Sequence, residues 1–138
     1  MKKIFVDSSF WYALASRDDA NHIKASAFAR QLQAGGALLF TSEPVLAETQ
    51  RLLMHRYGIE AGRRFLHQIF VQIERGFTRL LSASTDDLRR AVAIMDGLPD
   101  QDISLTDACS AVLMQRERIP YIAAFDRHFL LLGLRMMP

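Results

Sequence analysis

Four short apolar stretches, separated by segments with helical spacing, constrain the fold of this chain more than any other feature. They span residues 4–6, 37–40, 77–81 and 121–125. Predominantly apolar stretches of this length are typical of strands that are buried on both faces of a parallel sheet. We therefore predict strands at these four positions.

Helical periodicity marks the segments between the predicted strands. Apolar residues recur every three or four positions within residues 45–53, 65–73, 88–95 and 108–115, as on one face of a helix. Ser42, Ser84 and Ser104 precede three of these segments and are favourable N-cap residues. Strands that alternate with helices predict an α/β fold with a parallel sheet and right-handed crossovers.

Length and composition exclude several other classes of protein. The 138 residues fit one domain, residues 1–138, and a hydrophobic content of 50% suits a packed core. No apolar run reaches the roughly 18 residues that span a bilayer, so we expect no membrane segment and a cytoplasmic protein. The single cysteine, Cys109, permits neither an internal disulfide nor a cysteine-based zinc site.

Acidic residues occur where the predicted elements meet. Asp7 and Asp126 directly follow the first and last predicted strands, and ligands collect at the carboxyl ends of parallel strands. Glu48 lies at the edge of an apolar stripe, and Asp107 lies in the first turn after Ser104. Taken singly, the aspartates are explained as helix caps and Glu48 as a side chain that reaches water or an arginine.

Taken together, these acids indicate a metal site. Clustered carboxylates repel one another unless a cation neutralises them. Ligand sets made only of oxygen favour magnesium or manganese, ions that commonly activate water and stabilise a transferring phosphoryl group. The four histidines, at positions 22, 55, 67 and 128, form no zinc-type pair and are interpreted as surface or core residues.

The acidic motifs resemble the PIN domain family. The matching segments, in the family's order and over essentially the whole chain, are Asp7-Ser8-Ser9, Pro44 to Glu48, Ser104 to Ala108 and Phe125 to Phe129. The resemblance implies a three-layer α/β/α sandwich with a central parallel sheet. It also implies a nuclease site in which Asp7, Glu48, Asp107 and Asp126 hold Mg²⁺ or Mn²⁺, with Asp102, Thr106 and Ser8 as further candidates that support these ligands.

Within that family, the chain is similar to the VapC-type toxins of toxin-antitoxin pairs. The resemblance implies an endoribonuclease that acts on RNA, forms a homodimer and binds a protein antitoxin. A non-catalytic PIN-like binding module and an RNA-processing nuclease outside any toxin-antitoxin system remain alternatives. Two other acidic α/β enzymes are disfavoured: Ser9 replaces the second aspartate of haloacid-dehalogenase-like phosphatases, and no lysine follows the last strand as in receiver domains.

Basic and aromatic residues are candidates for contacts with RNA. When the four principal acids are set aside, the chain has 17 basic and 11 acidic residues. The rest of the protein is therefore mildly basic, although the net charge is only +2. Residues 10–12 are aromatic, and we interpret them as core or interface residues in preference to a platform for base stacking. The candidate cations near the motifs are Arg17, Lys24, Arg51, Arg56 and Arg127.

Overall fold

The computed structural model of the protein describes residues 2–138. Its strands are β1 (Lys3–Val6), β2 (Leu38–Ser42), β3 (Thr78–Leu81), β4 (Tyr121–Ala123) and β5 (Arg135–Met137). They form one sheet with the order β3-β2-β1-β4-β5, and all neighbouring strands are parallel. The predicted parallel α/β architecture is therefore confirmed.

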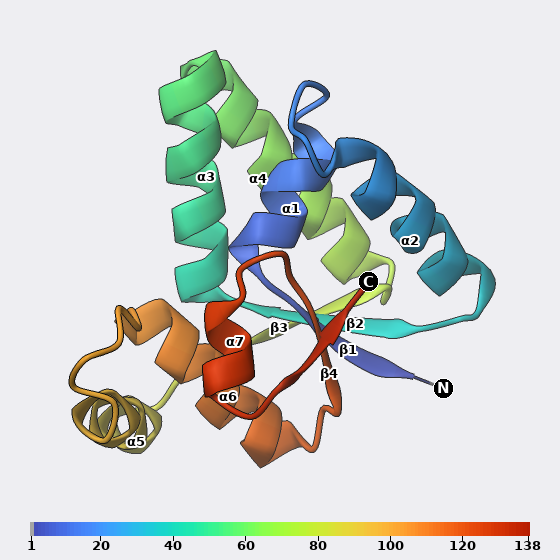
Figure 1. The fold of residues 1–138 in the computed structure, drawn as a ribbon. Helices are drawn as coiled ribbons and strands as arrows, with labels where there is room; N and C mark the ends of the chain where they lie inside the picture. Colours follow the sequence, from blue (N-terminus) through green and yellow to red (C-terminus); the bar gives the residue numbers. More distant parts are fainter. Residues whose placement is uncertain (1) are drawn as a thin grey trace.

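In the described part of the chain, seven helices flank this sheet. Their bounds are α1 (Ser8–Ala15), α2 (His22–Ala34), α3 (Glu43–Tyr57), α4 (Ile59–Glu74), α5 (Thr85–Asp96), α6 (Leu105–Glu117) and α7 (His128–Leu131). Figure 1 shows α1 to α4 on one side of the sheet and α5 and α6 on the other. This arrangement is the expected three-layer α/β/α sandwich.

The central strand explains why the first apolar stretch is continuous. Ile4, Phe5 and Val6 are all completely buried, because β1 has a strand on either side and helices over both faces. Phe5 is in register with Phe40 of β2 and with Ile122 of β4. Burial of these side chains is the main stabilising contribution at the centre of the fold.

The strand predictions are right in position but not in number or length. β5 is an additional strand, which a run of only three residues does not reveal. β2 continues through Thr41 and Ser42, which pair with Leu80 and Leu81 of β3. These polar side chains are buried at little cost, because Trp11 Nε1 donates a hydrogen bond to the Thr41 hydroxyl and Ser42 caps α3. β4 ends at Ala123, two residues earlier than predicted, and β3 begins after the exposed Phe77.

Two helices have too weak an apolar pattern to be predicted. α2 buries only Ala25, Phe28 and Leu32, and α7 is a single turn. The aromatic residues after Asp7 are part of the core, as expected: Phe10 and Trp11 are 2% and 3% exposed. Within residues 2–138, no helix combines the length and the apolar character needed to cross a bilayer.

Candidate metal centre

The topology brings the predicted acids to the carboxyl edge of the sheet. β1 pairs with β2 on one side and β4 on the other, so the strand order reverses between β1 and β4, where α/β proteins bind ligands. Asp7 follows β1 directly, and Asp126 follows β4 after a two-residue extension. Glu48 comes from α3, which follows β2, and Asp107 comes from the first turn of α6.

Asp7 is the most deeply buried of these acids. It caps α1, and only 2% of its surface is exposed. Its Oδ2 accepts hydrogen bonds from the Ser9 backbone N–H at 3.0 Å and from the Ser9 hydroxyl at 2.7 Å. Its Oδ1 is buried and has no hydrogen-bond partner among residues 2–138. An unpaired buried carboxylate oxygen is costly, so this atom requires a cation or a proton.

Glu48 and Asp107 each accept a hydrogen bond from a nearby serine. The Ser8 hydroxyl donates to Glu48 Oε1, which fixes the half-buried glutamate against the start of α1. Asp107 Oδ2 accepts the Ser104 backbone N–H at 3.4 Å, while the Ser104 hydroxyl accepts the Asp107 N–H at 3.1 Å. Asp107 is therefore part of a capping box, as its position after Ser104 indicated, and still faces the other acids.

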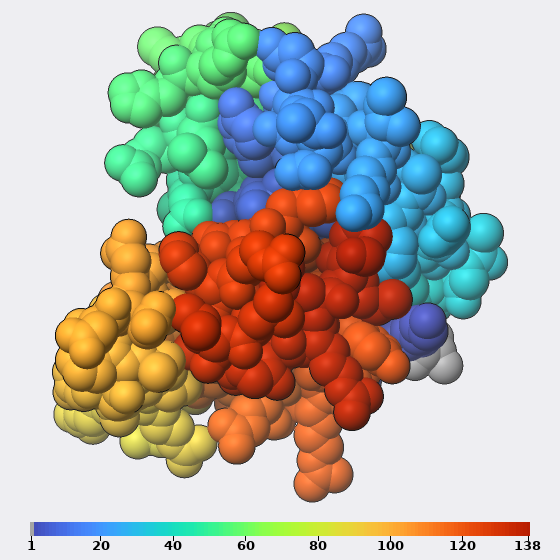
Figure 2. Space-filling model, in the orientation of Figure 1, coloured from blue at the N-terminus to red at the C-terminus, as the bar shows by residue number. Residues whose placement is uncertain are grey.

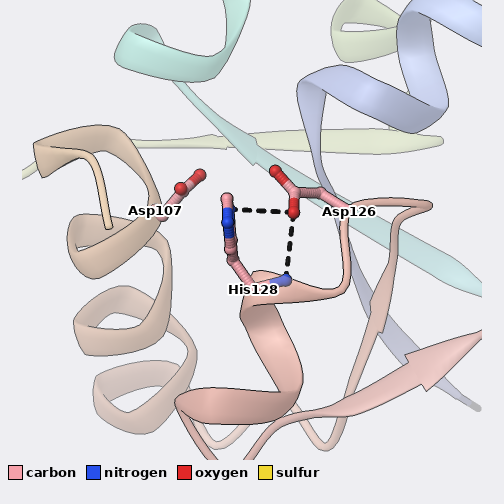
Figure 3. Close-up of side chains that lie close together, drawn as sticks. All are labelled: Asp107, Asp126 and His128. Carbon is pink, nitrogen blue, oxygen red and sulfur yellow. Dashed lines mark hydrogen bonds and ion pairs between the residues drawn. The ribbon is translucent and has the colours of Figure 1, made fainter. Parts of the chain in front are cut away.

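His128 joins Asp107 and Asp126 in one cluster. One potential ligand atom from each of these three side chains lies within 4.8 Å of the other two (Figure 3). Both the backbone N–H and Nδ1 of His128 lie 3.0 Å from Asp126 Oδ1. The side chain of His128 is 40% exposed, in agreement with its interpretation as a surface residue, but the sequence did not predict its position beside two of the candidate ligands.

Mutual repulsion and burial disfavour the ionised forms of the acids. Burial raises the pKa of Asp7 from 3.8 to about 6, and the charge of Asp107 contributes in the same direction. Burial also raises the pKa of Asp107, as do the charges of Asp126 and Glu48. Both increases in pKa mean that the groups around the site do not fully stabilise its negative charge.

These residues fit a divalent cation bound through oxygen. The unpartnered Asp7 Oδ1, together with three further carboxylates, supplies the donor set that magnesium and manganese prefer. Figure 2 shows the N-terminal part of the chain, in dark blue, recessed between the green of α3 and the red of the C-terminal segment. Glu48 and Asp126 are half-buried, so the candidate site is accessible from the surface on their side.

Asp7 gives the metal-free protein a defined pH dependence. Its pKa is about 6 in the folded state and 3.8 for the free side chain, so folding favours the protonated carboxyl group. The resulting contribution to stability is fully present below pH 3.8 and is lost as the pH rises through 6. Relative to Asp7→Asn, wild type should lose about 3 kcal/mol of unfolding free energy across this window. Urea unfolding of both proteins in EDTA measures this loss. A difference that does not change with pH would contradict it.

Two predicted supporting residues lie apart from these contacts. Asp102 is exposed in the loop before α6, and Thr106 is half-buried in the first turn of α6. Within residues 2–138, no side-chain hydrogen bond joins either of them to the four acids, so their roles stay predictions. The candidate RNA-binding cations are all exposed, and one of them, Arg56, forms a 2.6 Å ion pair with Asp18.

Sequence reasoning missed Ser9 as well as His128. The signal that could have revealed both is their spacing, because each lies two residues after a predicted ligand aspartate. Aspartate side chains commonly accept hydrogen bonds from the backbone two residues further on, which brings the side chain of that residue close too.

Comparisons with known proteins agree with this geometry. Residues 4–133 match the model of the PIN domain. The 23S rRNA-specific endonuclease VapC20 of Mycobacterium tuberculosis is 32% identical over 130 residues, which cover 91% of each chain. The crystal structure of VapC20, described as a sarcin-ricin loop cleaving toxin, superposes on the present structure with a TM-score of 0.80. The two sequences are 30% identical in this superposition, which covers 95% of each chain. The predicted resemblance is confirmed.

Proposed function

Because the chain belongs to the PIN domain family, we propose that it is a metal-dependent endoribonuclease that cuts 23S ribosomal RNA as the toxin of a toxin-antitoxin pair. The observation that carries the proposal is the buried Asp7 Oδ1, which has no partner among residues 2–138, near Asp107, whose charge raises the pKa of Asp7. Asp107 lies in one group of possible ligands with Asp126 and His128, and the charge of Glu48 also raises its pKa. The similarity to a 23S rRNA endonuclease supports the choice of substrate. With ribosomal RNA as substrate, we expect the protein to act in the cytoplasm.

In the proposed hydrolysis, the four acids would bind the metal ion. Bound magnesium or manganese supplies a Lewis acid that activates water and stabilises charge on the phosphodiester. Asp7 and Asp107, which are buried, would hold the ion at the sheet edge together with the half-buried Glu48 and Asp126, which lie closer to solvent. Exposed cations such as Arg17 and Arg127 would contact the RNA backbone.

Incubation of the purified protein with intact ribosomes tests the proposal. With Mg²⁺ or Mn²⁺ we expect a discrete cut in 23S rRNA, mapped by primer extension, and no cut after EDTA treatment. Cleavage of transfer or messenger RNA instead would support nuclease activity but assign it a different substrate. Intact RNA of every class, with either ion and after removal of any co-purified inhibitor, would favour a non-catalytic binding module.

Apolar side chains on α3 and α4 support the proposed protein partners. Among the described residues, six large hydrophobic side chains on these two helices are at least 36% exposed: Leu52, Met54, Tyr57, Ile59, Phe70 and Val71. Exposed apolar residues that gather on neighbouring elements mark protein-binding surfaces. We propose that this face takes part in binding the antitoxin or a second copy of the chain.

A further inference from the structure

The four carboxylates of the candidate metal centre share one arrangement. In each, the chain binds one oxygen: Ser9 binds Asp7 Oδ2, Ser8 binds Glu48 Oε1, Ser104 binds Asp107 Oδ2, and His128 binds Asp126 Oδ1. Within residues 2–138, no hydrogen bond reaches the second oxygen of any of them. Each acid therefore offers one oxygen and keeps the other occupied.

Asp7 and Asp126 show this arrangement in its strongest form. In both, the residue two positions later contributes its backbone N–H and its side chain to the same carboxylate oxygen. The Ser9 hydroxyl donates a hydrogen bond at 2.7 Å, and His128 Nδ1 lies 3.0 Å from Asp126 Oδ1. Figure 3 shows both interactions of His128 on one oxygen of Asp126, with the other oxygen left clear.

Ser9 also connects the two aspartates. Its hydroxyl donates to Asp7 at 2.7 Å and accepts the backbone N–H of Phe125 at 3.0 Å. Phe125 immediately precedes Asp126, so one side chain links the end of β1 to the extension of β4. In this extension the backbone N–H of Ala124 still donates to the carbonyl of Met137 in β5, whereas the N–H of Phe125 donates to the Ser9 side chain.

We propose that Ser9 and His128 are positioning residues, each of which holds one oxygen of a ligand aspartate so that only the other can bind the metal ion. The inference rests on the proposed metal-dependent function. Magnesium and manganese prefer octahedral coordination by water and by one oxygen from each carboxylate. Calcium accepts six to eight ligands and often binds both oxygens of a carboxylate. The arrangement therefore selects the smaller ions over calcium.

Titration calorimetry of the metal-free protein with Mn²⁺ and Ca²⁺ tests this role without measuring cleavage. Wild type should bind Mn²⁺ more tightly than Ca²⁺. Ser9→Ala and His128→Ala should each weaken Mn²⁺ binding by about 10- to 100-fold. Both should weaken Ca²⁺ binding less, because the released oxygen becomes available to the larger ion. Ser9→Thr and His128→Asn keep a donor at the same place and should restore the preference for Mn²⁺.

Two matched substitutions serve as controls. Ser82→Ala removes a serine that also donates to a carboxylate, that of Glu43, but on the exposed surface. His67→Ala removes an exposed histidine of α4. Both should leave the dissociation constants of the two ions unchanged. Thermal unfolding identifies any variant that does not fold, and His128, whose side chain is 40% exposed, can be replaced with little effect on the core.

The outcomes separate this role from the proposed function. Wild-type affinities for both ions in Ser9→Ala and His128→Ala would overturn the positioning role and leave the metal site intact. Equal weakening for both ions, without rescue by Ser9→Thr or His128→Asn, would reduce the two residues to a general structural role and would also overturn it. A wild-type protein that binds neither ion would remove the metal-dependent function itself.

Discussion

Asp7→Asn should cleave ribosomal RNA at least about a hundredfold more slowly than wild type while remaining folded. Asparagine keeps the shape of the side chain and an oxygen for the Ser9 hydrogen bonds, but it removes the charge that binds the cation. Because Asp7 Oδ1 is buried without a partner, no neighbouring group can replace it. Cleavage rates with saturating Mn²⁺, measured beside circular dichroism spectra, test both parts of this expectation.

The matched control is Asp100→Asn. This aspartate is exposed in the turn after α5, so the same chemical change there should leave the cleavage rate unaltered. Wild-type cleavage by a well-folded Asp7→Asn protein would remove Asp7 from the site and require another set of ligands.

Phe129→Ala should lower the free energy of unfolding by about 3–5 kcal/mol. Phe129 is completely buried, and its carbonyl oxygen accepts the backbone N–H groups of Leu132 and Leu134. It follows His128 directly, so its ring anchors the turn that carries Asp126 and His128 to the core. Removal of the ring leaves a cavity and loosens this turn. Urea unfolding monitored by tryptophan fluorescence measures the loss of stability.

Leu131→Ala in the same short helix provides the comparison. Leu131 is 48% exposed, so its truncation should change the unfolding free energy by no more than about 0.5 kcal/mol. Equal stability of the two variants would mean that Phe129 does not anchor this turn.

Elements whose apolar pattern is strong were predictable from the sequence. The strand around Ile4 and the helix that Ser104 caps both form where the pattern and the cap residue place them. β5 and α2 were not predictable, because a three-residue edge strand and a helix with three buried side chains leave almost no periodic signal. Their stability comes from neighbouring elements, as in the pairing of Ile122 with Met136.

The candidate site shows the same division. Acids that follow strands or begin helices could be identified individually, since the carboxyl edge of a parallel sheet is a known location for ligands. The partners of these acids could not. Histidine is ordinary in a sequence, and only the turn after β4 shows that His128 contacts Asp126 and lies beside Asp107.

Local patterns were enough to predict the parallel α/β class and the four candidate acids, because apolar runs and capping residues act over a few neighbouring positions. Which carboxylate oxygen accepts a hydrogen bond and which does not could be seen only in the folded structure. Those hydrogen bonds include contacts between segments far apart in the chain, such as Ser8 with Glu48 and Ser9 with Phe125. Their geometry depends on how the helices and strands pack, and no local pattern encodes it.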